Sequence, residues 1–274
     1  MATKKTARKD VTSTPVKQAR KSAASPGKAR AIAASEPVAP KAKAPAKAAK
    51  GRKRGGTAKP LAPERVASIL DALRRAYPDA VCALTHGNAW ELTVATILSA
   101  QSTDAGVNLA TPELFRLFPT PQLLAAANPA AIEELIHRTG FYRAKTKSIM
   151  GAARVVSERF GGEVPQTMDE MLELPGVARK TANVVLGSWY GIASGVVVDT
   201  HVLRLTRRLE LTRNEEPVKV EQDLQKVIPQ DRWIDFSHEL IHHGRRVCVA
   251  RKPRCAECSL ETVCNSGDKT WSSH

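Results

Sequence analysis

The sequence predicts an all-α fold for residues 61–274. Apolar residues recur there at the spacing of one helix face, as in "LAPERVASILDALRRAYP" at 61–78, where the stripe consists of Val66, Ile69, Leu70 and Leu73. Prolines and glycines stand where such helices begin and end. One stretch resembles a strand, "GVVV" at 195–198, but it is too short and isolated to found a sheet. The folded part should therefore consist of packed helices.

Local sequence features define the individual helices in chain order. Pro63 suits the first turn of the opening helix, and "AWELTVATILSAQSTD" at 89–104 predicts a buried helix that ends near Gln101. Thr167 and Glu170 have the spacing of a capping box, which predicts a helix in "TMDEMLEL". Amphipathic patterns predict further helices in "TPELFRLF" at 111–118, "NPAAIEELIHRTG" at 128–140, "RAKTKSIMGAARVVSERFGG" at 143–162, "DTHVLRLTRRLEL" at 199–211, "EPVKVEQDLQKVIP" at 216–229 and "DRWIDFSHELIHHGRRVC" at 231–248.

Residues 1–60 differ from the rest of the chain in composition. They hold 17 of its 42 lysines and arginines, two of its 27 acidic residues and no aromatic residue, so they carry the whole net charge of +15. Such a segment cannot bury enough apolar surface to fold, and we expect a disordered basic tail rich in Lys, Ala and Pro. The tail suits non-specific contact with phosphates, although a purely solubilising extension would have the same composition.

The chain shows no feature of a membrane protein. No stretch approaches the roughly 20 apolar residues of a membrane span, and the basic tail lacks the apolar segment of a targeting peptide. We expect a soluble, cytoplasmic protein, nucleoid-associated if the source is bacterial.

A tight turn joins two helices in "LELPGVARKTANVV" at 172–185. A short helix should end near Leu174, because Pro175 cannot continue it. Gly176 can adopt positive φ, and a second helix should begin near Ala178. The free N–H groups of the turn and of the second helix can hold a phosphate. An ordinary helical hairpin would use the same residues, so the turn alone leaves both interpretations open.

Lys180 stands at the head of the second helix, on the side opposite the apolar stripe and beside Gly187. A surface lysine is the ordinary outcome for such a position. The positive N-terminus of the helix, however, favours a neutral amine, which can attack an electrophilic carbon and form a Schiff base. We expect the small Gly187 to leave space beside this amine.

Asp199 opens a further helix in "SGVVVDTHVLRL". An aspartate at this position is commonly the N-cap of the helix. It could also act near the amine, as a base or as a stabiliser of developing positive charge. The two roles are compatible.

The C-terminal segment "CVARKPRCAECSLETVC" has the cysteine spacing C-x6-C-x2-C-x5-C. In a protein expected to be intracellular, these residues are interpreted as metal or cluster ligands rather than disulfides. A single C-x-x-C pair favours a [4Fe-4S] cluster, with zinc as the alternative. Arg251, Lys252 and Arg254 lie in the first gap and suit a DNA backbone. The four cysteines are Cys248, Cys255, Cys258 and Cys264.

Together these features resemble the helix-hairpin-helix DNA glycosylases and, among them, the endonuclease III family. The resemblance runs from about Leu61 to Cys264 and rests on four motifs. It implies two helical lobes with a DNA cleft between them: a six-helix lobe at 82–192 that contains the hairpin, and a lobe of residues 61–81 and 193–274 that holds a [4Fe-4S] cluster. The motifs are "LSAQSTD" at 98–104, "LPGVARKTANVV" at 174–185, "VDTH" at 198–201 and the cysteine spacing.

The resemblance implies a bifunctional DNA glycosylase and AP lyase of base-excision repair, which removes oxidised pyrimidines from duplex DNA. Lys180 would attack C1′ of the damaged nucleotide, and Asp199 would assist departure of the base. β-Elimination through the Schiff base would then cut the strand 3′ to the abasic site. A monofunctional adenine glycosylase would have a hydroxyl residue in place of Lys180, and a non-catalytic DNA-binding protein would make Lys180 and Asp199 incidental.

The resemblance also implies the DNA contacts. The backbone of Gly176 and Ala178 would hold a phosphate, Gln101 would fill the gap left by the flipped base, and Phe141 would be a second wedge. A stacked base cannot be attacked at C1′, so flipping is a requirement of the chemistry. The cluster would be structural and would position the basic loop. The partner would be double-stranded DNA with damaged bases or abasic sites, bound by a monomer. Two positions depart from the family: Ala178 stands where a glycine is frequent, and Phe141 replaces a smaller aliphatic residue.

Overall fold

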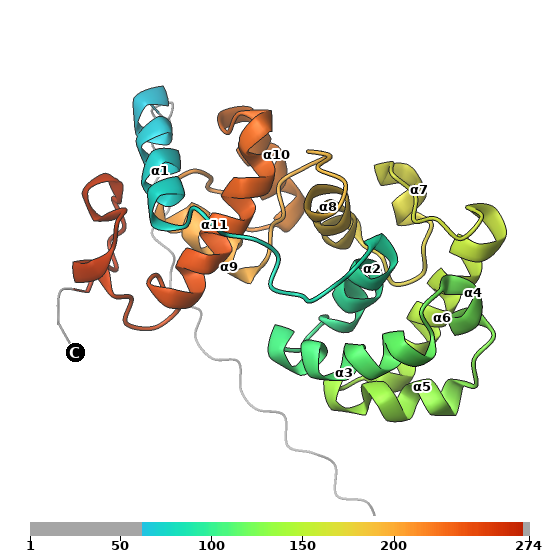
Figure 1. The fold of residues 1–274 in the computed structure, drawn as a ribbon. Coiled ribbons are helices and arrows are strands. Elements are labelled where there is room, and N and C mark those ends of the chain that lie inside the picture. The colour runs from blue at the N-terminus through green and yellow to red at the C-terminus, as the bar shows by residue number, and fades with distance from the viewer. Residues whose placement is uncertain (1–61, 271–274) are drawn as a thin grey trace, which may run out of the picture. The chain divides into compact units, whose positions relative to one another are not determined.

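The computed structural model describes residues 62–270, so the basic tail predicted at 1–60 lies outside the described residues. Within 62–270 all regular secondary structure is helical, and residues 195–198 form no strand, which confirms the predicted all-α fold (Figure 1). A search of these residues for a helix long and apolar enough to cross a membrane finds none.

One hydrophobic core is formed by the helices α2 to α8, which we call the hairpin lobe. Its buried residues run from Leu84 to Leu186 and include Leu98, Ile136 and Met171, all fully enclosed. The elements are α2 (Ala89–Leu98), α3 (Asp104–Leu117), α4 (Pro121–Ala125), α5 (Pro129–Ile136), the 3₁₀ turn η1 (His137–Thr139), α6 (Tyr142–Arg159), α7 (Met168–Leu172) and α8 (Arg179–Ser188).

A second core combines the first described helix with the last ones, and we call this part the cysteine lobe. Its buried residues come from 66–77 and from 196–260, and α1 packs against α11. The lobe boundaries drawn from the resemblance, 82–192 on one side and 61–81 with 193–274 on the other, stay a prediction. The elements are α1 (Pro63–Ala76), α9 (Thr200–Arg208), α10 (Pro217–Val227), η2 (Gln230–Arg232), α11 (Trp233–Arg246), η3 (Cys255–Glu257) and η4 (Glu261–Val263).

Helix ends follow the capping residues of the sequence, with two differences from the predicted limits. The Thr167 hydroxyl accepts the N–H of Glu170 at 3.3 Å, which confirms the predicted cap of α7. Helix α2 ends at Leu98, short of Gln101, because the left-handed φ of 55° at Gln101 cannot continue a helix. Helix α3 begins at Asp104 rather than at residue 111, because Thr103 caps it and Pro112 is accommodated inside it.

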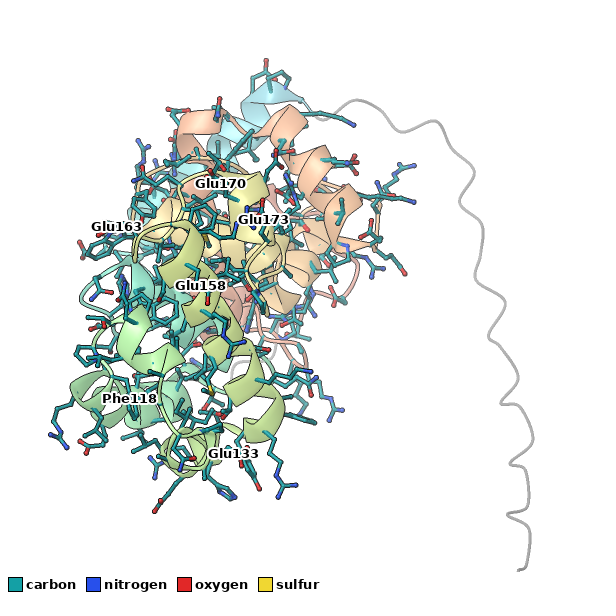
Figure 2. All side chains as sticks on the ribbon, turned by 90° about the vertical axis from the view of Figure 1, so that its right-hand side faces the viewer. Phe118, Glu133, Glu158, Glu163, Glu170 and Glu173 are labelled. Atoms are coloured by element: carbon teal, nitrogen blue, oxygen red, sulfur yellow. The ribbon has the colours of Figure 1, made fainter. Side chains whose placement is uncertain are left out.

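Acidic side chains mark one side of the hairpin lobe. Figure 2 shows Glu158, Glu163, Glu170 and Glu173 gathered around α6, α7 and the segment that joins them. One of these carboxylates, that of Glu173, forms an ion pair with Arg159.

Candidate active site

The turn between α7 and α8 has the conformation that the sequence predicts. Gly176 has φ 83°, and a Cβ there would lie 2.7 Å from Cβ of Ser148 and 3.4 Å from Cγ2 of Ile97. Real Cβ atoms essentially never come within 3.0 Å of such an atom, so both the backbone angle and the space call for glycine. The turn thus presses its backbone against α6 and α2.

Ala178 is the N-cap of α8 and has extended backbone, with φ −97° and ψ 169°. Among residues 62–270, no side chain caps this helix start with a hydrogen bond. The first N–H groups of α8 are therefore left to an external acceptor, in the positive field of the helix N-terminus. Since φ is negative, the methyl group of Ala178 adds no backbone strain relative to glycine.

Lys180 and Asp199 line one pocket, although they come from different lobes. Lys180 is exposed on the first turn of α8, as its place opposite the apolar stripe predicts. Gly187 does not leave space beside it, because a Cβ there would lie 3.2 Å from Cγ1 of Ile234 on α11. Instead, Gly187 lets the two lobes pack closely beneath the pocket.

Asp199 caps α9 through one carboxylate oxygen. Its Oδ1 accepts the N–H groups of His201 at 2.7 Å and Val202 at 2.8 Å. No hydrogen-bond partner of Oδ2 is found among residues 62–270, and the side chain is half-buried at the pocket wall. The N-cap that the sequence predicts is confirmed, and the second oxygen stays available to a ligand.

Polar contacts between the lobes hold the walls of this pocket together. Arg179 Nε donates to Oε2 of the buried Glu221 on α10 at 2.8 Å, and Asn183 donates to Oε1 at 2.9 Å. At the opposite wall, Arg245 of α11 donates to Oδ2 of Asp104 at 2.6 Å. These two ion pairs fix α8 and α3 relative to α10 and α11.

His238 of α11 also lines the pocket, and its Nε2 lies 3.1 Å from Oγ of Ser188 on α8. Burial lowers the pKa of His238, with a smaller contribution from His242 and a counteracting one from Asp235. Sequence reasoning missed His238, Asp104 and Ser99 in this pocket. Ser99 and Asp104 both lie in the motif at 98–104, but His238 is far from them in sequence and reaches the pocket only through the packing of α11.

Gln101 and Phe141 are both exposed, and both adopt left-handed backbone, with φ 55° and 48°. Gln101 lies in the turn after α2, and Phe141 is the N-cap of α6. Phe141 is 68% exposed, so its ring is free to contact a ligand. Left-handed backbone is energetically costly at non-glycine residues, and such strain is concentrated at functional sites. Gln101 and Phe141 are therefore candidate functional residues.

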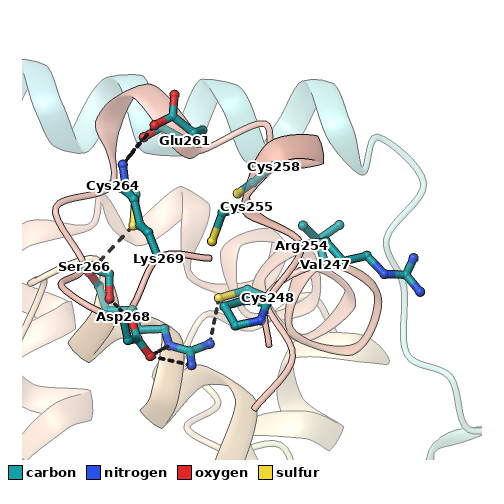
Figure 3. Close-up of a pocket in the computed structure, with 12 residues that line it drawn as sticks. Val247, Cys248, Arg254, Cys255, Cys258, Glu261, Cys264, Ser266, Asp268 and Lys269 are labelled. Atoms are coloured by element: carbon teal, nitrogen blue, oxygen red, sulfur yellow. Dashed lines mark hydrogen bonds and ion pairs between the residues drawn. The ribbon is translucent and has the colours of Figure 1, made fainter. Parts of the chain in front are cut away.

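The four cysteines line a single pocket at the end of the cysteine lobe (Figure 3). Burial raises the pKa of Cys258 to about 11 and also raises that of Cys248. Ligation through thiolates in this pocket therefore requires a positively charged centre between them. In the described part of the chain, no three His, Cys, Asp or Glu side chains form a group that could hold one metal ion.

Hydrogen-bond donors surround the cysteine sulfurs. Such donors stabilise the thiolates of metal and iron–sulfur sites. Arg208 Nη1 donates to Cys248 Sγ at 3.2 Å and the Thr270 N–H donates to Cys255 Sγ at 3.4 Å, while His243 Nε2 lies 3.4 Å from Cys258 Sγ.

The basic loop between Cys248 and Cys255 is exposed at Arg251, Lys252 and Arg254. Arg208 supports it from beneath, donating to the carbonyl of residue 249 at 2.8 Å. Its ends are therefore attached to α11 and to the cysteine pocket, while its cations face solvent.

Known proteins match both the sequence and the fold. Residues 94–230 match the model of the HhH-GPD superfamily of base excision DNA repair proteins. Endonuclease III of Synechocystis is 54% identical over 203 residues, which cover 74% of this chain and 93% of that protein. Endonuclease III of Escherichia coli K12 is 38% identical over 201 residues, which cover 73% and 95%.

Solved structures agree with this assignment. A non-covalent endonuclease III–DNA complex and a trapped covalent endonuclease III–DNA intermediate each align with a TM-score of 0.71 and 39% identity, over 75% of this chain and 96% of theirs. Fold and hairpin thus define a base excision DNA repair protein of the HhH-GPD superfamily. Within that class, the chain belongs to the endonuclease III family, as its motifs suggest.

Proposed function

We propose that the protein is a bifunctional DNA glycosylase and AP lyase. It removes oxidised pyrimidines from duplex DNA and cuts the strand 3′ to the resulting abasic site. The observation that carries the proposal is that Lys180, exposed at the head of α8, lines one pocket with Asp199. The relatives named endonuclease III and the trapped covalent intermediate support it.

In this reaction the amine of Lys180 forms a bond to C1′ of the damaged nucleotide. The bond from C1′ to the base breaks, and its electron pair leaves with the base, which gains a proton. The ionised carboxylate of Asp199 stabilises the positive charge that develops at C1′ while the base leaves, and its Oδ2 then accepts the proton that the amine loses. The C1′–O4′ bond then breaks, O4′ gains a proton, and a Schiff base forms between C1′ and the lysine nitrogen. Solvent removes a proton from C2′, and the C3′–O bond breaks with its electron pair leaving on the 3′ phosphate, which completes the β-elimination.

Duplex DNA would be held by groups around this pocket. The uncapped start of α8, at Gly176 and Ala178, would bind a backbone phosphate. Gln101 and Phe141 would fill the space left by the flipped nucleotide. The exposed basic loop would contact phosphates further along the duplex. The protein would bind the duplex as a monomer. Since the proposed substrate is duplex DNA, we also propose a cytoplasmic location, nucleoid-associated if the source is bacterial.

We also propose that the four cysteines hold a [4Fe-4S] cluster. Four thiols from one short segment line one pocket, hydrogen-bond donors point at two of the sulfurs, and a ring nitrogen of His243 lies against a third. The donor set fits such a cluster. When bound, the cluster would crosslink the C-terminal segment and hold the basic loop; it would not enter the cleavage. A brown protein with matching iron and sulfide contents supports this assignment, whereas a colourless protein that contains zinc contradicts it.

Borohydride trapping on an abasic-site duplex tests the lysine assignment. Borohydride reduces a Schiff base to a stable amine, so the wild-type protein should become crosslinked to the DNA. Lys180→Gln should abolish the crosslink. Lys219→Gln, at an exposed lysine on α10, should crosslink like the wild type. A Lys180→Gln protein that still traps would exclude Lys180 as the nucleophile.

The substrate class is tested by base release from matched duplexes that contain an oxidised pyrimidine, an oxidised purine or uracil. Oxidised pyrimidines should be released fastest. DNA binding without base release or nicking on any of these duplexes would indicate a non-catalytic DNA-binding protein instead.

A further inference from the structure

Lys145 is a buried lysine on α6 that neither of the proposed roles above uses. Its residue exposure is only 5%, whereas Lys147 on the same helix is exposed. Its ammonium donates to the carbonyl oxygen of Thr139 at 2.7 Å and to Oγ of Ser102 at 2.8 Å. Ser102 Oγ in turn donates to the same Thr139 carbonyl. The three groups therefore form a closed triangle of hydrogen bonds.

Burying this ammonium is costly, because no carboxylate among the described residues forms an ion pair with Lys145. Burial lowers the pKa of Lys145 for the same reason. An apolar side chain would avoid the cost of burial but could not donate hydrogen bonds. Lysine donates to two acceptors at once here, which requires a group with several N–H bonds.

The triangle joins the two segments that carry the exposed left-handed residues. Ser102 directly follows Gln101, and Thr139 precedes Phe141 by two residues. The first segment links α2 to α3, and the second links η1 to α6. Helix α6 has no side-chain cap at Phe141. Among residues 62–270, the hydrogen bonds of this triangle are the polar contacts found between the two segments.

We propose that Lys145 is a positioning residue that fixes the spacing between Gln101 and Phe141. This inference rests on the proposed function, in which both side chains occupy the duplex when the nucleotide flips. Two segments that move independently would rarely reach the gap together. The ammonium crosslink holds both backbones in the left-handed conformation in advance, so that insertion costs no reorganisation.

The test compares Lys145→Met with the control Lys147→Met. Methionine keeps the apolar stem and removes the donor. Single-turnover release of an intact oxidised base should fall by about 10²-fold in Lys145→Met, because a small misplacement of positioning groups has that effect. Borohydride trapping on abasic DNA, in which no base needs to be extracted, should stay within a few-fold of the wild type. Lys147→Met should match the wild type in both assays.

The fluorescence of a base analogue placed opposite the lesion reports insertion into the duplex directly. A residue that only stabilises the fold would not change this fluorescence. Insertion of Gln101 and Phe141 unstacks this base, so binding of the wild type should raise its fluorescence, and Lys145→Met should lose that rise. If Lys145→Met fails to fold, Ser102→Ala decides the question, because it removes the bridging hydroxyl but keeps the lysine. Equal losses of base release and trapping, or no loss of either, would overturn the positioning role. A wild-type protein that never traps would refute the proposed function, whatever Lys145 does.

Discussion

Arg179 and Glu221 form an ion pair at 2.8 Å that joins the helix of Lys180 to α10. The Glu221 side chain is 6% exposed, and that of Arg179 is 40% exposed. Lys180 follows Arg179 directly, so this pair anchors the proposed nucleophile to the cysteine lobe. Of the two side chains in the pair, only that of Glu221 is deeply buried.

Glu221→Gln should lower the free energy of unfolding by about 1–2 kcal/mol, because Asn183 and Arg179 lose a charged acceptor, while Arg179 can turn to solvent. The trapping rate should fall as well, because α8 is less firmly held. Urea unfolding and borohydride trapping measure the two effects. Glu158→Gln on α6, labelled in Figure 2, should change neither. Unaltered stability of Glu221→Gln would show that the pair does not anchor α8.

Gly176→Ala should destabilise the protein by about 1–3 kcal/mol, because alanine at φ 83° is strained and its Cβ meets Ser148. DNA affinity should fall with it. The control is Ala178→Gly, where extended backbone suits either residue, so that only a few tenths of a kcal/mol are expected. Thermal unfolding and a binding titration measure both. A larger effect at Ala178 than at Gly176 would reverse our assignment of the turn.

Asp199→Asn should separate the two roles of this residue. Asparagine caps helices as well as aspartate, so the free energy of unfolding should change by less than about 1 kcal/mol. Base release should nevertheless fall by about 10²-fold or more, because the charged oxygen is lost. Asp199→Ala should lose both stability and activity. If Asp199→Asn released the base at the wild-type rate, the role of Asp199 would be limited to capping α9.

The stability of the protein should depend on pH through His238. The folded state lowers the pKa of His238 below 6.5, so the unfolded chain binds more protons as the pH falls through that value. The free energy of unfolding should thus be lost progressively below about pH 6.5. Urea unfolding at two pH values should show a smaller loss for His238→Gln than for the wild type. The same change at the exposed His137 should leave the wild-type pH dependence intact.

Removal of residues 1–60 should flatten the salt dependence of DNA binding. This segment holds the whole net charge of +15, and each phosphate that it neutralises steepens the fall of affinity with salt. Titrations at several salt concentrations, with and without the segment, provide the two slopes. Equal slopes would contradict an electrostatic role of the tail.

Much of the fold and of the site could be predicted because it depends on local spacing. Helical periodicity gave the all-α class, and the Pro-Gly turn located the start of α8 within a residue. Asp199 was expected as an N-cap because the cap is made with the next turn of its own helix. The cysteine pocket follows from one segment of 17 residues, Cys248 to Cys264.

Other features could not be predicted, because they are made by side chains distant in sequence. Glu221 lies 42 residues from Arg179, and Ser102 lies 43 residues from Lys145. Separations of this length correspond to no sequence motif, so neither contact could be predicted. Gly187 was misjudged for the same reason, since Ile234, which occupies the space beside it, belongs to a different lobe. A single sequence indicates periodicity and caps but not which faces meet.

The contacts of α1 with α11 and η4 join residues far apart in sequence, so we expect them to form late in folding. The Tyr77 hydroxyl lies 2.9 Å from Nδ1 of His243, across 166 residues of sequence, and Arg65 donates to the carbonyl of Val263 across 198. During synthesis the hairpin lobe can collapse on contacts within its own stretch, while α1 waits for the C-terminal helices. The pocket shared by Lys180 and Asp199 therefore closes last, so that a chain shortened at its C-terminus should retain a folded hairpin lobe but no nicking activity.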